Sequence, residues 1–292
     1  MIDGEAYLPV PHRPDATMHL LNEINPENLA GLQGVFADID ETISTRGKIH
    51  PRAFDALWRL HDAGFRVVPV TGRPAGWCDH IARFWPVDAV VGENGGFYFH
   101  HDGSKMRKRF LHGEKERAGF RRRLAALRRR ILKEVPGCAV ASDQRYREYD
   151  LAIDFCEDVP ALPRAEVLRI KALFEEAGAH ARISSVHVNG WYGDFDKLST
   201  ALLCARELFD LDLQADNRLF AFCGDSPNDE PMFRFFERSF GVANVRDFAD
   251  LMTHKPAFVT RAPSGEGFVE VAEFLLKARA MESCTKDPNG KE

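Results

Sequence analysis

Three short apolar segments alternate with two helical patterns in the first third of the chain, and this alternation constrains the fold more than any other feature. The first helical pattern has apolar residues at helical spacing and stops at a glycine. Strand, helix, strand, helix, strand with short connections predicts a parallel sheet covered by helices, with ligands bound at the carboxyl ends of its strands. The predicted strands are residues 34–37, 65–70 and 88–91, and the predicted helices are residues 51–60 and a segment that ends at Phe84.

Two carboxylates follow the first predicted strand, one residue apart. Residues two apart on an extended strand point the same way, so Asp38 and Asp40 could face one small volume. Two like charges held that close are costly unless a cation, a shared proton or a mobile loop relieves the repulsion. The alternative is an aspartate-rich turn that caps the next segment, with Thr42 as a local hydrogen-bond partner. Taken alone, the pair leaves both interpretations open.

The overall composition excludes several classes of protein. A chain of 292 residues, 45% hydrophobic and 28% charged, suggests one large core with an insert. The net charge of −5 and the pI near 6.1 give no drive toward nucleic acid or a membrane surface. The sequence has no apolar run of membrane-spanning length and no signal-peptide pattern, and its six cysteines form no CxxC pair. We therefore expect a cytoplasmic protein with no nucleic-acid or membrane partner; the sequence leaves the oligomeric state undetermined.

The middle of the chain has a different pattern, which predicts an inserted domain. The order helix, two strands, helix, two strands is typical of an antiparallel α+β unit. Its first helix, residues 114–134, is rich in arginine, which is typical of a solvated helix face and also compatible with a basic surface that attracts anionic substrates. The predicted boundaries are an N-terminal extension at 1–30, a core at 31–96 and 196–278, the insert at 97–195 and a disordered tail at 279–292.

Further polar groups follow the other segments of the predicted core. Thr71 and Gly72 follow the second strand, Lys197 begins a helix, and residues 224–229 follow a strand at 219–223. Each group alone could be a helix cap, a surface lysine or an ordinary turn. That interpretation does not explain why all of them fall at one edge of one predicted sheet. Aspartates for Mg²⁺, a lysine and turn amides for a phosphate, and one carboxylate to attack are what a phosphoryl site needs.

At this point the sequence resembles the haloacid dehalogenase superfamily of phosphohydrolases, because its four motifs occur in order. They are Asp38-Ile39-Asp40-Glu41-Thr42, Val70-Thr71-Gly72-Arg73, Lys197, and Gly224-Asp225-Ser226-Pro227-Asn228-Asp229. The insert between the second and third motifs resembles the cap of subfamily IIB, and Glu93-Asn94-Gly95-Gly96 resembles a turn of the Cof-like members. The resemblance implies an α/β fold: a Rossmann-like parallel sheet core with helices on both faces, plus an inserted α+β cap domain of the C2 type.

The resemblance also implies a role for each motif residue in a Mg²⁺-dependent phosphatase. Asp38 would form an aspartyl-phosphate, and Asp40 would protonate the leaving alcohol, activate water and ligate Mg²⁺ through its main-chain carbonyl. Asp38 and Asp225 would be direct metal ligands, and Asp229 would act mainly through metal-bound water. The phosphate would be held by Thr71, Gly72, Lys197 and Asn228. Two positions depart from the pattern: Glu41 and Leu198 stand where many relatives have glycine.

We expect the cap to recognise the rest of the substrate, a small phosphorylated sugar or similar alcohol. His187, Asn189 and Trp191 alternate along one predicted strand and share a face that could contact a sugar, although a half-exposed sheet shows the same pattern. The candidate substrate contacts are Asn94, Arg147, His187, Asn189 and Trp191. Two alternatives to a phosphatase are a sugar phosphomutase, which returns the phosphoryl group to a bisphosphorylated intermediate, and a non-catalytic sugar-phosphate sensor.

Overall fold

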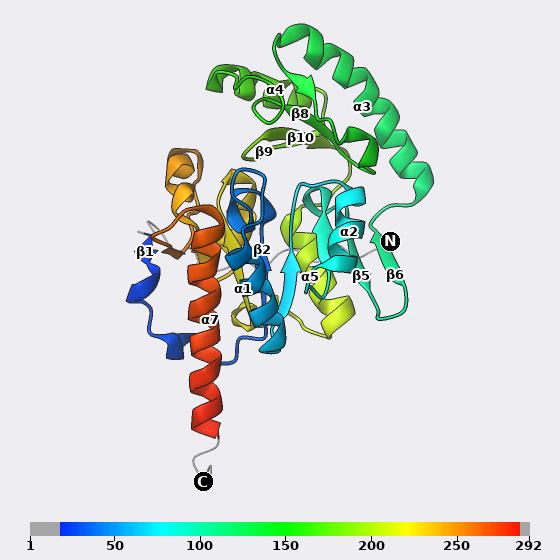
Figure 1. The fold of residues 1–292 in the computed structure, drawn as a ribbon. Helices are drawn as coiled ribbons and strands as arrows, with labels where there is room; N and C mark the ends of the chain where they lie inside the picture. The colour runs from blue at the N-terminus through cyan, green and yellow to red at the C-terminus, as the bar shows by residue number, and fades with distance from the viewer. Residues whose placement is uncertain (1–17, 287–292) are drawn as a thin grey trace.

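The computed structural model describes residues 18–286, in which a core and a cap are stacked one above the other (Figure 1). The core contains a six-stranded sheet of order β1-β13-β12-β11-β2-β3, and every neighbouring pair is parallel. The predicted parallel sheet is therefore confirmed. Its strands are β1 (His19–Leu20), β2 (Gly34–Ala37), β3 (Arg66–Pro69), β11 (Phe220–Gly224), β12 (Ser239–Gly241) and β13 (Phe258–Val259).

Helices cover both faces of this sheet because successive strand residues point to opposite sides. Val35 belongs to the apolar cluster under α1 and α7, whereas its neighbour Phe36 belongs to the cluster under α5 and α6. Both side chains are fully buried. The strands are therefore continuous apolar segments, as expected for a parallel sheet covered on two sides. The core helices are α1 (Pro51–Asp62), α2 (Ala75–Phe84), α5 (Lys197–Phe209), α6 (Glu230–Phe235) and α7 (Ser264–Lys286).

Three further strands extend the core beyond β3. Val70 bridges Val91 in parallel, which places β4 (Val90–Gly92) beside β3. The hairpin of β5 (Phe97–His101) and β6 (Met106–Phe110) then pairs antiparallel with β4. These two strands fall inside the predicted insert but pair with a core strand. The exact border between core and cap stays a prediction.

The cap is an antiparallel sheet of order β7-β8-β10-β9 with two helices on one face. Leu127 and Ile131 of α3 and Ile170 of α4 pack on this face in one apolar cluster. Figure 1 shows the sheet lying between these helices and the core. The inserted α+β cap is thus confirmed. Its elements are α3 (Glu114–Glu134), β7 (Ala139–Val140), β8 (Leu151–Asp154), α4 (Arg164–Glu176), β9 (His180–Ile183) and β10 (His187–Trp191).

The two ends of the chain differ from the sequence prediction. The predicted tail starts at 279, yet α7 continues to Lys286. Arg279 donates a 2.7 Å hydrogen bond to the Leu32 carbonyl, so the last turns of α7 are tied to the core. In the predicted N-terminal extension, β1 joins the core sheet through β13, while residues 1–17 lie outside the described part. Within residues 18–286, no helix combines the length and apolar character that a membrane span requires.

Candidate active site

Four charged side chains from three segments meet at the carboxyl end of the core sheet. Lys197 Nζ donates a 2.7 Å hydrogen bond to Asp38 Oδ1 and another of 2.7 Å to Asp229 Oδ1. Carboxylate oxygens of Asp38, Asp225 and Asp229 lie within 4.8 Å of one another, and all three residues are buried. Three carboxylates around one ammonium group leave a local excess of negative charge. The arrangement fits a divalent cation, because hard cations such as Mg²⁺ prefer carboxylate oxygens.

The electrostatics of this cluster follow from its burial. Burial raises the pKa of Asp38 to about 7, although the nearby Lys197 opposes that shift. The pKa of Asp225 is also raised well above its usual value, first by burial and then by the charges of Asp38 and Asp229. Burial alone would lower the pKa of Lys197, but the two carboxylates that it contacts raise it, so it stays a cation. Charges this unbalanced are typical of functional sites rather than of packing.

The loop after β11 is built to present its aspartates. Asp229 Oδ2 accepts hydrogen bonds from the amides of Asp225 (3.0 Å) and Ser226 (3.3 Å), which closes the loop on itself. Thr42 Oγ1 donates to Asp225 Oδ1 at 3.3 Å, and Asn244 Nδ2 donates to Asp225 Oδ2 at 3.1 Å. Asn244 was not predicted, because a lone asparagine after β12 has no distinctive sequence pattern. It also donates to the Glu41 carbonyl at 3.1 Å and so links the first and fourth motifs.

The chain leaves the extended conformation directly after Asp38. Ser44 N donates to the Ile39 carbonyl at 2.8 Å, closing a turn in which Glu41 has the left-handed φ of 55°. This conformation explains why glycine suits the position. The Glu41 carboxylate accepts hydrogen bonds from Arg46 N at 2.7 Å and Ser264 Oγ at 3.0 Å. It is therefore held by groups outside the carboxylate cluster and is no member of it.

The turn also separates the two aspartates of the first motif. Asp38 joins the carboxylate cluster, whereas Asp40 forms an ion pair with Arg73. Arg73 Nε lies 3.0 Å from both Asp40 oxygens, and Arg73 Nη2 donates to Asp40 Oδ1 at 2.8 Å. Both aspartates still line one small cavity. Their different partners suit different tasks, with Asp38 in the carboxylate cluster and Asp40 beside an arginine.

The second motif forms a tight turn between core and cap. Thr71 Oγ1 accepts a 3.0 Å hydrogen bond from Arg73 N, which shapes the turn. The Gly72 carbonyl accepts from Arg147 Nη1 of the cap at 2.8 Å. A Cβ atom at position 72 would lie 3.3 Å from Asn94 Nδ2, so a larger residue would crowd the turn. Asn94 Nδ2 is buried and has no hydrogen-bond partner within the described structure, which makes it an available donor beside this turn.

Two of the predicted substrate contacts are engaged by neighbouring side chains. The fully buried Arg147 forms ion pairs with Asp143 (3.1 Å) and Asp150 (2.9 Å), and Asn189 Nδ2 donates to Asp150 Oδ2 at 2.8 Å. Asn189 and His187 line the small cavity, whereas Trp191 does not. The cavity is lined by Asp38, Asp40, Gly72, Arg73, Ser184, Ser185, Val186, His187, Asn189, Ser226 and Asn228.

The size of this cavity shows that the cap is closed over the site. Its volume is about 10 Å³, which is about the space that one water molecule needs. The cap turn at 184–186, between β9 and β10, forms one wall, and Ser226 and Asn228 of the core form another. A phosphomonoester cannot fit without movement of this turn. Entry of a substrate therefore requires the cap to open.

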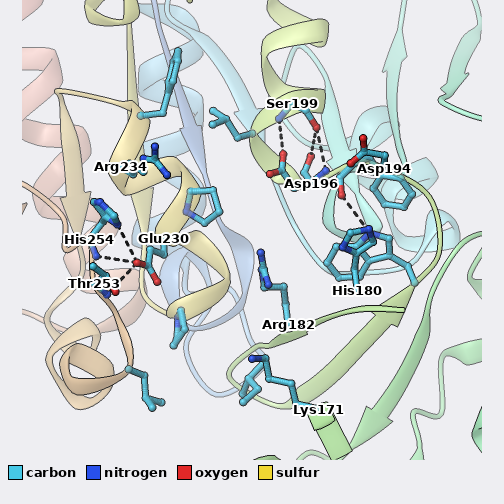
Figure 2. Close-up of a pocket in the computed structure, with 18 of the residues that line it drawn as sticks. Lys171, His180, Arg182, Asp194, Asp196, Ser199, Glu230, Arg234, Thr253 and His254 are labelled. Atoms are coloured by element: carbon cyan, nitrogen blue, oxygen red, sulfur yellow. Dashed lines mark hydrogen bonds and ion pairs between the residues drawn. The ribbon is translucent and has the colours of Figure 1, made fainter. Parts of the chain in front are cut away.

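Trp191 lines a separate and much larger groove between cap and core. This groove has a volume of about 950 Å³. Figure 2 shows Lys171 and Arg182 on its cap side and Glu230 and Arg234 on its core side. Trp191 lies at the edge of this groove and is only 2% exposed. Its indole N–H donates to the Phe195 carbonyl at 3.2 Å. Its main role in this structure is therefore packing.

We expect Trp191→Ala to lower the free energy of unfolding by about 3–5 kcal/mol, the usual cost of truncating a buried aromatic residue. Urea unfolding followed by circular dichroism measures this change. Trp58→Ala is the matched control, because Trp58 is 46% exposed and should cost less than about 0.5 kcal/mol. Unchanged stability together with altered substrate preference would instead restore Trp191 as a substrate contact.

Glu93 joins core and cap through a buried carboxylate. It accepts hydrogen bonds from Ala75 N of the core (3.0 Å) and from the consecutive cap amides of residues 148–150 (2.6–3.1 Å). Burial raises the pKa of Glu93 to about 8, which these donors oppose by stabilising the ionised form. Its side chain is completely buried, so it fixes one side of the cap on the core. In the sequence, Glu93 was noted only as part of the turn Glu93-Asn94-Gly95-Gly96, and no role was predicted for its side chain.

Glu93→Gln is expected to destabilise the protein by about 1–3 kcal/mol, the cost of a buried donor that loses its acceptor. The new side-chain amide would place its NH₂ group against backbone N–H groups that now donate to the carboxylate. Two donors cannot form a hydrogen bond with each other. Thermal unfolding compared with Glu23→Gln tests this, because the Glu23 side chain is 53% exposed. Equal unfolding midpoints for the two variants would contradict the assigned role.

Comparisons with known proteins agree with this fold. Residues 35–117 match the family of haloacid dehalogenase-like hydrolases. The chain is 26% identical over 251 residues to a phosphoglycolate phosphatase from Archaeoglobus fulgidus, covering 83% of this chain and 96% of that protein. A Thermoplasma acidophilum structure aligns with a TM-score of 0.62 at 21% identity, covering 84% of this chain and 99% of the other. Sucrose-phosphatase from Synechocystis aligns with a TM-score of 0.57 at 14% identity, covering 83% and 97%.

The sequence match and the structure account for different motifs of the site. The matched segment contains the first two motifs, and the structure brings the third and fourth to the same sheet edge. The two solved structures share the overall fold across more than four-fifths of the chain. The chain is therefore similar to the haloacid dehalogenase-like hydrolases over residues 35–117, and its parallel core and inserted cap complete the fold around that segment.

Proposed function

We propose that this protein is a Mg²⁺-dependent phosphatase that hydrolyses a small phosphomonoester through an aspartyl-phosphate on Asp38. The observation that carries the proposal is the buried cluster of Asp38, Asp225 and Asp229 around Lys197. A structural ion pair would balance its charges, whereas this cluster has more carboxylates than cations. Asp38, Asp225 and the main-chain carbonyl of Asp40 would hold Mg²⁺, and Asp229 would support them from the same cluster.

The reaction takes two steps. An Asp38 oxygen attacks phosphorus, the bond between phosphorus and the alcohol oxygen breaks, and Asp40 gives its proton to the departing alcohol. Asp40 then takes a proton from a water molecule that attacks the aspartyl-phosphate, which releases phosphate and restores Asp38. Lys197 offsets the negative charge of the phosphoryl group, and Thr71, Gly72 and Asn228 orient it. Mg²⁺, when bound, would offset the repulsion between the phosphate and the carboxylates.

The cap supplies the rest of substrate recognition in this proposal. The cap turn that carries Ser184 and Ser185, together with His187, would contact the alcohol part after closure, since these residues line the cavity. Hydroxyl and imidazole groups suit the hydroxyls of a small sugar. We propose a sugar phosphate or a similarly small phosphorylated alcohol as substrate. The similarity to a phosphoglycolate phosphatase places phosphoglycolate among the compounds to test.

The test is phosphate release from sugar phosphates, phosphoglycolate, nucleotides and phosphorylated cofactors with Mg²⁺. We expect release from at least one small phosphomonoester, and no release from any compound would overturn the proposal. Isomerisation of a hexose phosphate without release of phosphate would identify a phosphomutase instead.

Removing Mg²⁺ with EDTA is expected to abolish phosphate release, and adding Mg²⁺ should restore it. Binding at the aspartate cluster should also stabilise the fold, by about 2.7 kcal/mol at one hundred times the dissociation constant. Differential scanning calorimetry with increasing MgCl₂ measures this gain, with NaCl at equal ionic strength as the control. Asp225→Asn should reduce the Mg²⁺-dependent shift. An equal shift with NaCl would contradict a specific site.

A further inference from the structure

Arg73 lies where carboxylates of the core and of the cap converge. Its Nη2 group donates to Asp40 Oδ1 of the core at 2.8 Å and to Glu157 Oε1 of the cap at 2.7 Å. Its Nη1 group lies 3.6 Å from Asp143 Oδ2, also of the cap. The arginine side chain is only 5% exposed. A single guanidinium group therefore connects the expected acid–base residue with two cap carboxylates.

Glu157 has little freedom of its own within the cap. Its backbone amide donates to Asp154 Oδ1 at 2.7 Å, which closes the turn after β8. Its second carboxylate oxygen lies 2.8 Å from Nε2 of the buried His187. His187 and Arg73 lower the pKa of Glu157 to about 2, so it is an anion at neutral pH. The position of this charge therefore depends on the position of the cap.

The guanidinium group is also restrained on its flat face. Arg73 Cζ lies 4.5 Å from the centroid of the Trp77 ring. The ring, Asp40 and Glu157 together fix the plane of the guanidinium group. Its hydrogen bonds to Asp40 lie in that plane, so they fix the carboxylate as well. With the cap open, Asp40 would be the one carboxylate among the described residues that still binds Arg73. The orientation of Asp40 thus depends on a contact that cap closure makes.

We propose that Glu157, acting through Arg73, is a positioning residue that orients Asp40 for proton transfer when the cap closes. This inference rests on the proposed function, in which Asp40 gives a proton to the leaving alcohol. It gives the cap a part in the chemical step in addition to substrate binding. Small misplacements of a catalytic group cost large factors in rate, so the contact matters even though Glu157 does not touch the cavity.

The test compares substrates that differ in their need for a proton. Glu157→Gln keeps the shape of the side chain but removes its charge. Single-turnover cleavage of the best alkyl phosphate of the panel should fall about tenfold, because its alkoxide is a poor leaving group. The burst of p-nitrophenolate from p-nitrophenyl phosphate should stay within about twofold of the parent, because this leaving group needs no proton.

Glu134→Gln is the matched control, since Glu134 forms ion pairs of 2.7 and 2.6 Å with Arg130 and Arg169 within the cap. It should change neither rate. Equal losses of Glu157→Gln on both substrates, or no loss on either, would overturn the inference. If Glu157→Gln unfolds at a much lower temperature than Glu134→Gln, Glu157→Asp repeats the comparison with the charge kept but the reach shortened. An inactive parent protein would instead contradict the proposed function itself.

Discussion

Asp38→Asn is expected to lose phosphatase activity by at least about 10³-fold, because the amide cannot attack phosphorus or form the acyl phosphate. The same change should stabilise the Mg²⁺-free protein. It removes one charge from three buried carboxylates that lie within 4.8 Å, while its amide oxygen still accepts the hydrogen bond from Lys197. A gain of about 1 kcal/mol is in the range of common single stabilising substitutions.

Opposite changes in activity and stability would exclude misfolding as the cause of inactivity. Initial rates on the best substrate and urea unfolding in EDTA measure the two quantities. Asp62→Asn is the matched control, because the Asp62 side chain is 72% exposed, and it should change neither. Turnover by Asp38→Asn at the parent rate would refute the assignment of the nucleophile.

Lys197→Met should damage both activity and stability. It removes the cation that contacts Asp38 and Asp229 at 2.7 Å and leaves their charges buried without a partner. Breaking a buried ion pair by removing one member typically costs about 3–5 kcal/mol. Loss of a cation that stabilises the transferring phosphoryl group should lower kcat/KM by about 10²-fold or more.

Mg²⁺ separates the two effects of Lys197→Met. Saturating Mg²⁺ should recover part of the stability, because a divalent cation compensates the same carboxylates, but it should not restore the rate. The exposed Lys108, whose side chain is 44% exposed and which pairs with Asp79 at 3.0 Å, provides the control substitution Lys108→Met. A parent-like unfolding midpoint for Lys197→Met in EDTA would show that the cluster is not held by this lysine.

Sequence patterns were most informative where one local rule acts alone. The alternation of apolar strands and amphipathic helices predicted the parallel core, and the changed order at 97–195 predicted an antiparallel insert. Chain ends were less predictable. The segment after Ala278 was predicted to be a disordered tail. Arg279 nevertheless donates to the Leu32 carbonyl, a contact between residues far apart in sequence.

The partners of individual site residues could not be predicted from spacing. Asp38 and Asp40 line one cavity, as the spacing predicted, but spacing could not show that the turn at Glu41 pairs Asp40 with Arg73 and Asp38 with Lys197. Glu157 and Asn244 had no distinguishing sequence context, and both contact site residues from distant segments.

The sequence by itself determined the fold class and the chemical groups of the site, because strand alternation and motif residues are local properties of the chain. Only the tertiary structure decided which carboxylate pairs with which cation, that Trp191 packs between core and cap, and that the cap closes the cavity at the cap turn 184–186. Ion pairing and burial depend on distances between segments that are remote in sequence. Those distances are set by how the cap sits on the core.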